Sequence, residues 1–87
     1  MRESTIENKV CNYATKQGWY VYKCTGLKGA PDRILHKEGK TFYIEFKRPG
    51  GTPTKMQKVF HKRLTAHGIA VFIIDDIEEG MRCVDSQ

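Results

Sequence analysis

The chain has 87 residues, which is enough for a single domain of residues 1–87 and leaves little room for a second. Its 15 Lys and Arg residues outnumber its 10 Asp and Glu residues, and the net charge of +5 favours a polyanionic partner such as nucleic acid. No apolar run is long enough to span a membrane, and the N-terminus lacks the apolar core of a signal peptide, so we expect no membrane partner and a cytoplasmic location.

The first predicted element is a helix from about Ser4 to Gln17. Ser4 has the side chain of an N-cap, Glu7 follows three residues later as in a capping box, and Gly18 is a suitable stop. Four apolar residues recur at helical spacing and predict one buried face: Ile6, Val10, Tyr13 and Ala14.

Three strands are predicted next. Trp19 to Cys24 is rich in aromatic and β-branched residues, and Thr25 to Pro31 is a loop punctuated by two glycines and a proline. Arg33 to Lys37 and Thr41 to Lys47 then form a predicted hairpin around the turn Glu38-Gly39-Lys40.

The remaining residues predict a crossover helix followed by a strand. After a break at Arg48 to Pro53, the helix runs from about Thr54 to His67. Ile69 to Ile74 is a continuous apolar run, which is typical of a strand buried on both faces. Asp75 to Gln87 is ambiguous between a short helix, a strand and a frayed tail. The helix has four apolar residues on one predicted face: Met56, Val59, Phe60 and Leu64.

The order of elements is helix, three strands, helix, strand (αβββαβ). Because the last strand follows a crossover helix, it can lie parallel to one of the hairpin strands. The sequence therefore predicts an α/β fold with a central mixed β-sheet flanked by helices.

Three side chains of the hairpin carry the candidate chemistry. Strand alternation places Glu45 and Lys47 on one face, and Asp32 opens the neighbouring strand, where it can approach both. Carboxylates and a main-chain carbonyl are the oxygen ligands that Mg²⁺ or Mn²⁺ prefers, and a nearby lysine can orient water and stabilise charge on a phosphate. The alternative is an ordinary hairpin with a solvated ion pair and a turn-capping aspartate. The opposite, core face has three apolar residues: Phe42, Ile44 and Phe46.

The segments Gly29-Ala30-Pro31-Asp32 and Ile44-Glu45-Phe46-Lys47 resemble the PD…(D/E)XK signature of restriction-like nucleases. More narrowly, the chain is similar to the VRR-NUC (virus-type replication-repair nuclease) group. That group has a helix with a glutamate, a G-x-P-D turn, an E-x-K strand, a glycine-containing loop and a glutamine opening the next helix. The matching positions span nearly the whole chain: Glu7, Gly29 to Arg33, Glu45 to Lys47, Gly50-Gly51 and Gln57.

The resemblance implies a restriction-endonuclease-like core and an Mg²⁺- or Mn²⁺-dependent DNA endonuclease. It implies that Asp32, Glu45 and the main-chain carbonyl of Phe46 hold the metal ion. Glu7 would complete the site directly or through water, and Glu3, one turn earlier, is the alternative acid.

The resemblance also assigns roles to two further residues. Lys47 corresponds to the catalytic lysine of the group, and Gln57 would lie near the active site and hold a water or a phosphate oxygen. Gln57 has an alternative explanation, because Thr54 and Gln57 also fit a capping box. Members of the group cleave flaps, branches or Holliday junctions, and many stand-alone members are phage homodimers. Branched DNA, a homodimer and the cytoplasm of a bacterium or phage-infected host are therefore expected.

Two other functions remain open on the sequence alone. The chain could be a non-catalytic nucleic-acid-binding module with the same fold, or a nuclease subunit that is active only within a larger replication or repair complex. Some of the residues flanking the motif are expected to line a DNA cleft: Tyr22, Lys23, Lys28, Arg33, Arg48, Lys55 and Lys58. The histidines lie outside the motif and are expected to be neutral residues that are at the surface or partly buried: His36, His61 and His67.

Overall fold

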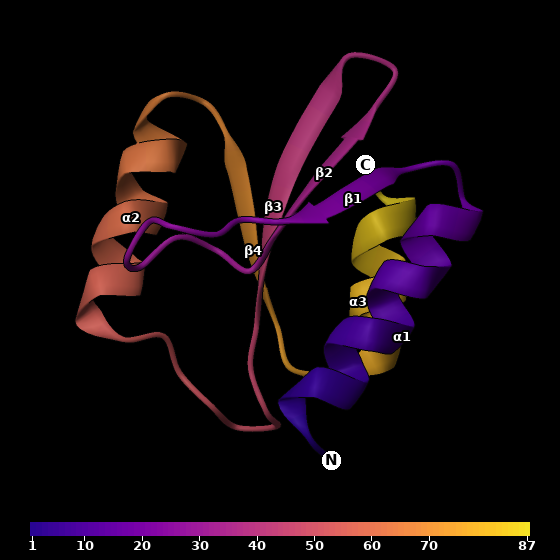
Figure 1. The fold of residues 1–87 in the computed structure, drawn as a ribbon, viewed down its shortest axis with the longest axis horizontal. Helices are drawn as coiled ribbons and strands as arrows, with labels where there is room; N and C mark the ends of the chain where they lie inside the picture. Colours follow the sequence, from indigo (N-terminus) through magenta and orange to yellow (C-terminus); the bar gives the residue numbers. More distant parts are fainter.

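A computed structural model describes all 87 residues and has three helices around one four-stranded sheet (Figure 1). None of these helices is both long and apolar enough to cross a lipid bilayer. The elements in chain order are α1 (Glu3–Lys16), β1 (Tyr20–Lys23), β2 (Arg33–Lys37), β3 (Lys40–Phe46), α2 (Lys55–Ala66), β4 (Ala70–Ile74) and α3 (Ile77–Asp85).

The sheet has the strand order β1-β2-β3-β4. The pairs β1–β2 and β2–β3 are antiparallel, and β4 lies parallel to β3 with Phe42 opposite Ala70 and Phe46 opposite Ile74. Helices α1 and α3 lie together on one side of the sheet and α2 lies on the other side (Figure 1). The predicted α/β fold with a mixed sheet flanked by helices is confirmed.

The hydrophobic core lies between the sheet and the pair α1–α3. Phe42, Ile44 and Phe46 point into it and are 2%, 0% and 0% exposed, which confirms the predicted alternation along β3. Trp19 closes one end, with its ring edge-to-face against Phe42 at 4.9 Å between centroids. The strands β2 and β4 add Leu35 and Ile74, and the helices contribute the other buried apolar side chains of this cluster: Ile6, Val10, Cys11, Ala14 and Val84.

The N-terminal cap differs from the sequence-based expectation, and the C-terminal segment adopts one of the three forms that the sequence left open. The predicted N-cap at Ser4 is wrong, because α1 begins at Glu3 and the capping residue Arg2 makes no side-chain hydrogen bond. A carboxylate in the first turn interacts favourably with the helix dipole there. The ambiguous segment after β4 forms α3, whose N-cap Asp76 accepts a hydrogen bond from the main-chain N–H of Glu79.

The other face of the sheet also departs from expectation. β4 is an edge strand and its Ile73 is 44% exposed, so the predicted burial on both faces is wrong. The predicted apolar face of α2 is only partly buried, because Met56 and Val59 are 48% and 50% exposed while Phe60 and Leu64 are half-buried. The buried residue of α2 is His61. The helix turns its polar side toward β3 because a buried carboxylate there, that of Glu45, requires polar neighbours.

Gly80 allows α3 to approach α1 closely. A Cβ atom at this position would lie 2.5 Å from a methyl group of Val10 and 3.0 Å from one of Ile74. We expect Gly80→Ala to destabilise the protein by about 1–2 kcal/mol, because overpacking outweighs the better helix propensity of alanine. Thermal unfolding measures this change, and an unchanged or higher melting temperature would show that the two helices can move apart without cost.

Candidate active site

Asp32 is held where the loop between β1 and β2 enters the sheet. Its Oδ2 accepts a hydrogen bond from the main-chain N–H of Phe46 at 2.7 Å. Because β2 and β3 are antiparallel, the start of β2 lies beside the end of β3. The hydrogen bond therefore fixes the Asp32 carboxylate at the end of the strand that carries Glu45.

Glu45 lies on the face of β3 opposite the core, yet it is only 1% exposed. Its Oε2 accepts a hydrogen bond from Nε2 of Gln57 at 3.1 Å and lies 3.7 Å from Nζ of Lys47. Its Oε1 faces Nε2 of His61 at 3.6 Å, and neither of these two buried atoms has a hydrogen-bond partner. Buried polar atoms are normally paired, so the unpartnered Oε1 has an unused capacity to bind a cation or donor.

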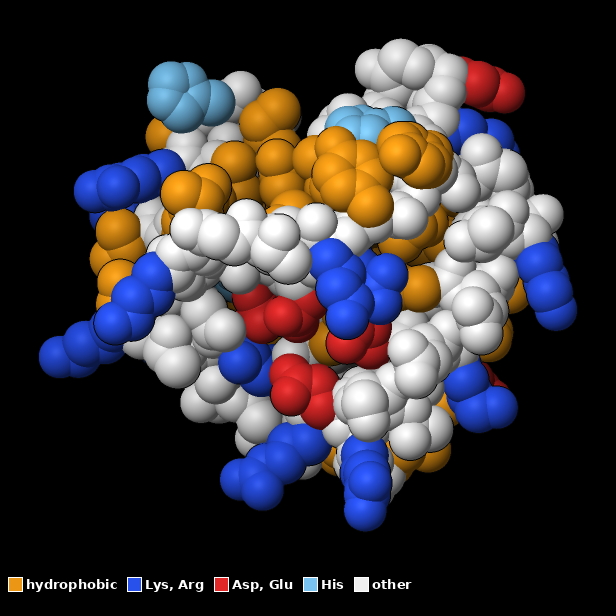
Figure 2. Space-filling model, in the orientation of Figure 1, with side chains coloured by type: hydrophobic (Ala, Val, Ile, Leu, Met, Phe, Trp, Pro, Cys, Tyr) orange, Lys and Arg blue, Asp and Glu red, His pale blue; other side chains and the backbone are white.

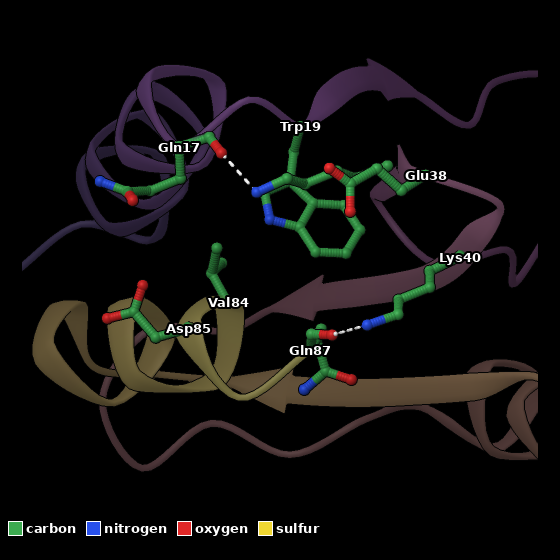
Figure 3. Close-up of a pocket in the computed structure, with 8 residues that line it drawn as sticks. Gln17, Trp19, Glu38, Lys40, Val84, Asp85 and Gln87 are labelled. Atoms are coloured by element: carbon green, nitrogen blue, oxygen red, sulfur yellow. Dashed lines mark hydrogen bonds between the residues drawn. The ribbon is translucent and has the colours of Figure 1, made fainter.

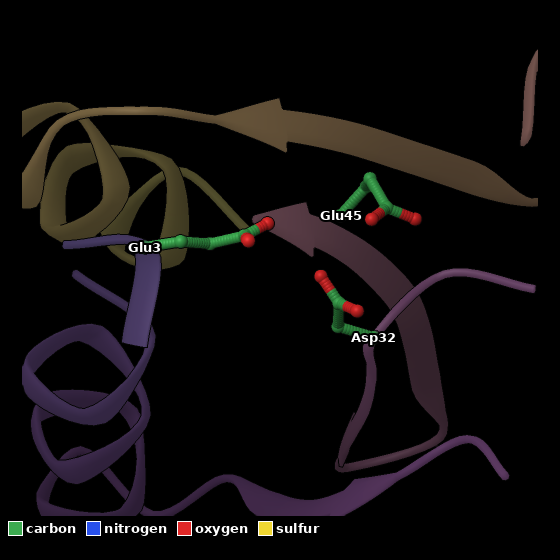
Figure 4. A group of neighbouring side chains, drawn as sticks. All are labelled: Glu3, Asp32 and Glu45. Atoms are coloured by element: carbon green, nitrogen blue, oxygen red, sulfur yellow. The ribbon is translucent and has the colours of Figure 1, made fainter. Parts of the chain in front are cut away.

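The carboxylates of Glu3, Asp32 and Glu45 converge on one point (Figure 4). Each offers an oxygen within 4.8 Å of the others. Glu7 is not part of this group, because its Oε2 accepts a hydrogen bond from Nε of Arg33 at 2.7 Å. Of the two acids considered on α1, the structure thus brings Glu3 to the other carboxylates and pairs Glu7 with the residue after Asp32.

The cluster of three carboxylates has one nearby lysine, Lys47, and therefore carries an excess of negative charge. Burial, followed by the negative charge of Asp32, raises the pKa of the Glu45 carboxyl to about 8, whereas Lys47 acts in the opposite direction. Burial also lowers the pKa of His61, with Lys47 adding to the effect, so this imidazole is neutral near pH 7. A divalent cation among the three carboxylates would relieve the repulsion, and their oxygen atoms are the donors that Mg²⁺ and Mn²⁺ prefer.

Gln57 takes part in a capping box and also contacts the acidic cluster. The side-chain Oε1 of Gln57 accepts a hydrogen bond from the main-chain N–H of Thr54 at 2.8 Å, and the main-chain N–H of Gln57 donates to Oγ1 of Thr54 at 3.2 Å. This capping box starts α2. The Nε2 group of the same side chain donates to Glu45. Capping the helix and contacting the acidic cluster are therefore compatible roles.

Sequence reasoning missed His61, which is 9% exposed and faces Glu45. A usable signal was present, because His61 follows Gln57 by four residues and side chains at this spacing share a helix face. His61 is more buried than the expected surface or partly buried residue. His36 fits that expectation better, since it is half-buried and bonds the hydroxyl groups of Tyr22 and Thr41.

An open polar hollow of about 380 Å³ lies beside the acidic cluster. Lys47 and Arg48 line it together with Glu3 and the glycine-containing segment Gly50 to Thr52. Arg33, another basic residue expected near DNA, forms an ion pair with Glu7 instead. The hollow thus joins positive side chains to the acidic cluster, which suits a phosphate group placed next to a metal ion.

A second pocket, of about 180 Å³, opens between the ends of α1 and α3 and the β2–β3 turn (Figure 3). Its two lysines are already engaged. Lys37 donates to the main-chain oxygen of Gln17 at 2.7 Å, and Lys40 donates to that of Gln87 at 2.9 Å. These contacts tie the hairpin to the helices, and the pocket contains none of the three clustered carboxylates.

Gly29 sets the position of the loop that carries Asp32. It has a φ of +84°, and a Cβ atom there would lie 2.8 Å from the main-chain oxygen of Met56 in α2. Gly26, in the same loop, has a φ of +88° but open space around it. We expect Gly29→Ala to lower both the melting temperature and any metal-dependent activity more than Gly26→Ala, because only the first adds a backbone clash to the conformational strain. Equal effects in the two variants would mean that the contact with α2 does not position Asp32.

The mixed sheet flanked by helices, with an acidic cluster and a lysine at the end of β3, is compatible with the fold of α/β proteins that have a restriction-endonuclease-like core. No established family profile matches the chain. The chain is 37% identical over 78 residues to "Putative nuclease p44" of Acyrthosiphon pisum secondary endosymbiont phage 1, and the alignment covers 86% of this chain and 84% of that protein. The chain belongs to the same family as this phage protein.

Proposed function

We propose that the chain is a divalent-metal-dependent DNA nuclease of the PD-(D/E)XK superfamily, related to the VRR-NUC group. The observation that carries this proposal is the convergence of Glu3, Asp32 and Glu45 within 4.8 Å, with Lys47 beside them. The name of the phage relative supports nuclease activity in general.

The metal ligands in this proposal are the three clustered carboxylates and the main-chain carbonyl of Phe46. Bound Mg²⁺ or Mn²⁺ would supply a Lewis acid and lower the pKa of a coordinated water. The unpartnered Oε1 of Glu45 and its raised pKa both favour a cation at this position. Glu7 then has a supporting role, in which it holds Arg33 next to Asp32.

The remaining side chains orient the reacting groups and neutralise negative charge on the phosphate. Lys47 places an ammonium group 3.7 Å from Glu45, at the wall of the polar hollow, where it can hold the attacking water or a phosphate oxygen as negative charge develops. Gln57 fixes the orientation of the Glu45 carboxylate through its amide N–H. Arg48 lines the same hollow and can contact the DNA backbone. The reaction adds water to phosphorus and breaks the bond between phosphorus and the leaving oxygen.

We extend the proposal to branched DNA and a homodimer, since two copies would supply two active centres for two strands. Both extensions come from the resemblance to the VRR-NUC group. Size supports the homodimer, because an 87-residue domain buries a modest core and is often stabilised by association.

The experiment is a cleavage assay on four labelled substrates, namely a single strand, a duplex, a flap and a four-way junction, with Mg²⁺, Mn²⁺ or a chelator. We expect cleavage with metal, none with chelator, and a preference for the branched substrates. Asp32→Asn is the inactive control. Wild-type protein that binds these substrates and never cuts them would favour a binding module. Cleavage that requires an added partner protein would favour a subunit of a larger complex.

A further inference from the structure

An apolar groove lies on α2 next to the loop that carries Asp32. Met56, Val59 and Phe60 form its floor, and the first two are about half exposed. Lys28, Lys55 and Arg63 form its rim, and the groove has a volume of about 270 Å³. No acidic side chain lines it. The groove therefore combines apolar surface with positive charge only.

The charge of α2 indicates the kind of partner. Its twelve residues include no acidic residue, and its four basic side chains make no ion pair: Lys55, Lys58, Lys62 and Arg63. Two copies of the chain packed through this face would bring like charges together, which opposes self-association here. A polyanion satisfies the same charges.

The groove is close to the acidic cluster. Consecutive residues of α2 contact the groove and the acidic cluster, because Met56 lines the groove and Gln57 donates a hydrogen bond to Glu45. Gly29, three residues before Asp32, packs against the backbone of Met56. Figure 2 shows hydrophobic side chains among Lys and Arg side chains over α2, with acidic side chains near the centre of the same face. The groove and the acidic cluster are therefore connected through one helix and one loop.

We propose that this groove binds unpaired nucleotides of the DNA strand next to the cleavage point. The apolar floor takes the faces of the bases, and the basic rim contacts the phosphates. Duplex DNA stacks its base faces against one another and cannot offer them to such a floor. The inference rests on the proposed nuclease function and specifies its substrate as DNA with a single-stranded segment.

The test measures DNA binding in the presence of chelator, so that cleavage plays no part. One probe is a duplex, and the other is the same duplex with a single-stranded arm. The variant Met56→Ser/Val59→Ser removes the apolar floor and keeps all basic residues. Tyr20→Ser is the matched control, because Tyr20 is 68% exposed and lies on β1, at the opposite edge of the sheet. Melting temperatures verify folding.

We expect the double variant to bind the armed DNA about tenfold more weakly and the plain duplex within twofold of wild type, because apolar surface that contacts the base faces is lost while the phosphate contacts remain. Lys55→Gln/Arg63→Gln should weaken binding to both probes and reduce the salt dependence. Equal losses on both probes, or no loss, would overturn the inference. A shift of the double variant from dimer to monomer in sedimentation would also overturn it, because a second copy would then occupy the groove. If wild-type protein shows the expected binding and never cleaves with Mn²⁺, the proposed nuclease function fails while the groove assignment stands.

Discussion

Replacing Glu45 with glutamine is expected to produce a protein that melts about 5–10 °C above wild type at pH 8 in chelator and no longer cleaves DNA. Glutamine has nearly the same shape, and it removes a charge from a side chain that is 1% exposed and lies close to two other carboxylates. The same substitution removes a proposed metal ligand. Stability and activity should therefore move in opposite directions.

The pH dependence of this gain follows from the pKa of Glu45. Its pKa of about 8 in the folded protein lies above the ordinary value of 4.5, so the folded state holds the proton more tightly than the unfolded chain between these values. Wild-type stability is consequently lost as pH rises through this window, by at most about 1.4 kcal/mol per pH unit. The difference between Glu45→Gln and wild type should be absent below pH 4.5, grow up to about pH 8 and stay constant above it.

Two further measurements sharpen this prediction. Glu3→Gln is the matched control, because Glu3 belongs to the same cluster but is exposed, so its substitution should weaken metal binding without raising the melting temperature in chelator. Added Mn²⁺ should raise the melting temperature of wild type at pH 8 and leave Glu45→Gln unchanged. If Glu45→Gln melts below wild type at pH 8, the buried carboxylate is already compensated and the site has no need of a cation.

The second large effect concerns Lys47. We expect Lys47→Ala to reduce the cleavage rate by about 100- to 10,000-fold, because it removes the largely buried positive charge that we propose to face the reacting phosphate. DNA binding in chelator should change by only a few fold, since one phosphate contact among several is lost. Single-turnover cleavage and equilibrium binding separate the two quantities.

Lys58→Ala provides the control for Lys47→Ala. Lys58 is an exposed lysine of α2 that lines neither the acidic cluster nor the polar hollow, so its loss should lower affinity modestly and leave the single-turnover rate unchanged. Cleavage by Lys47→Ala at the wild-type rate would exclude this lysine from the chemical step.

The sequence predicted the sheet better than the helix packing. Alternation along β3 and the parallel return of β4 depend on local patterns, and both are present in the structure. The orientation of α2 is different, because its apolar residues Met56 and Val59 remain exposed. Periodicity identifies the apolar face of a helix, but the partner of that face depends on tertiary contacts, here on the buried carboxylate of Glu45.

The candidate site was predictable to a similar extent. The approach of Asp32 to Glu45 and Lys47 follows from hairpin geometry, and the structure brings these three residues together. The choice between Glu3 and Glu7 could not be made from the sequence, because residues four apart share one helix face. Arg33 decides it, since its guanidinium bonds Glu7 and leaves Glu3 for the cluster. Which acid a distant arginine pairs with is a long-range contact that no local pattern reveals.

Gln57 has a consequence for which amino acids this position can accommodate. One planar amide accepts from the backbone at the start of α2 and donates to the carboxylate of Glu45. Glutamate could only accept, lysine and arginine could only donate, and asparagine is one methylene shorter. Glutamine is thus the side chain of this length that carries both an acceptor and a donor on one planar group. The start of α2 and the orientation of Glu45 therefore both constrain the residue at position 57.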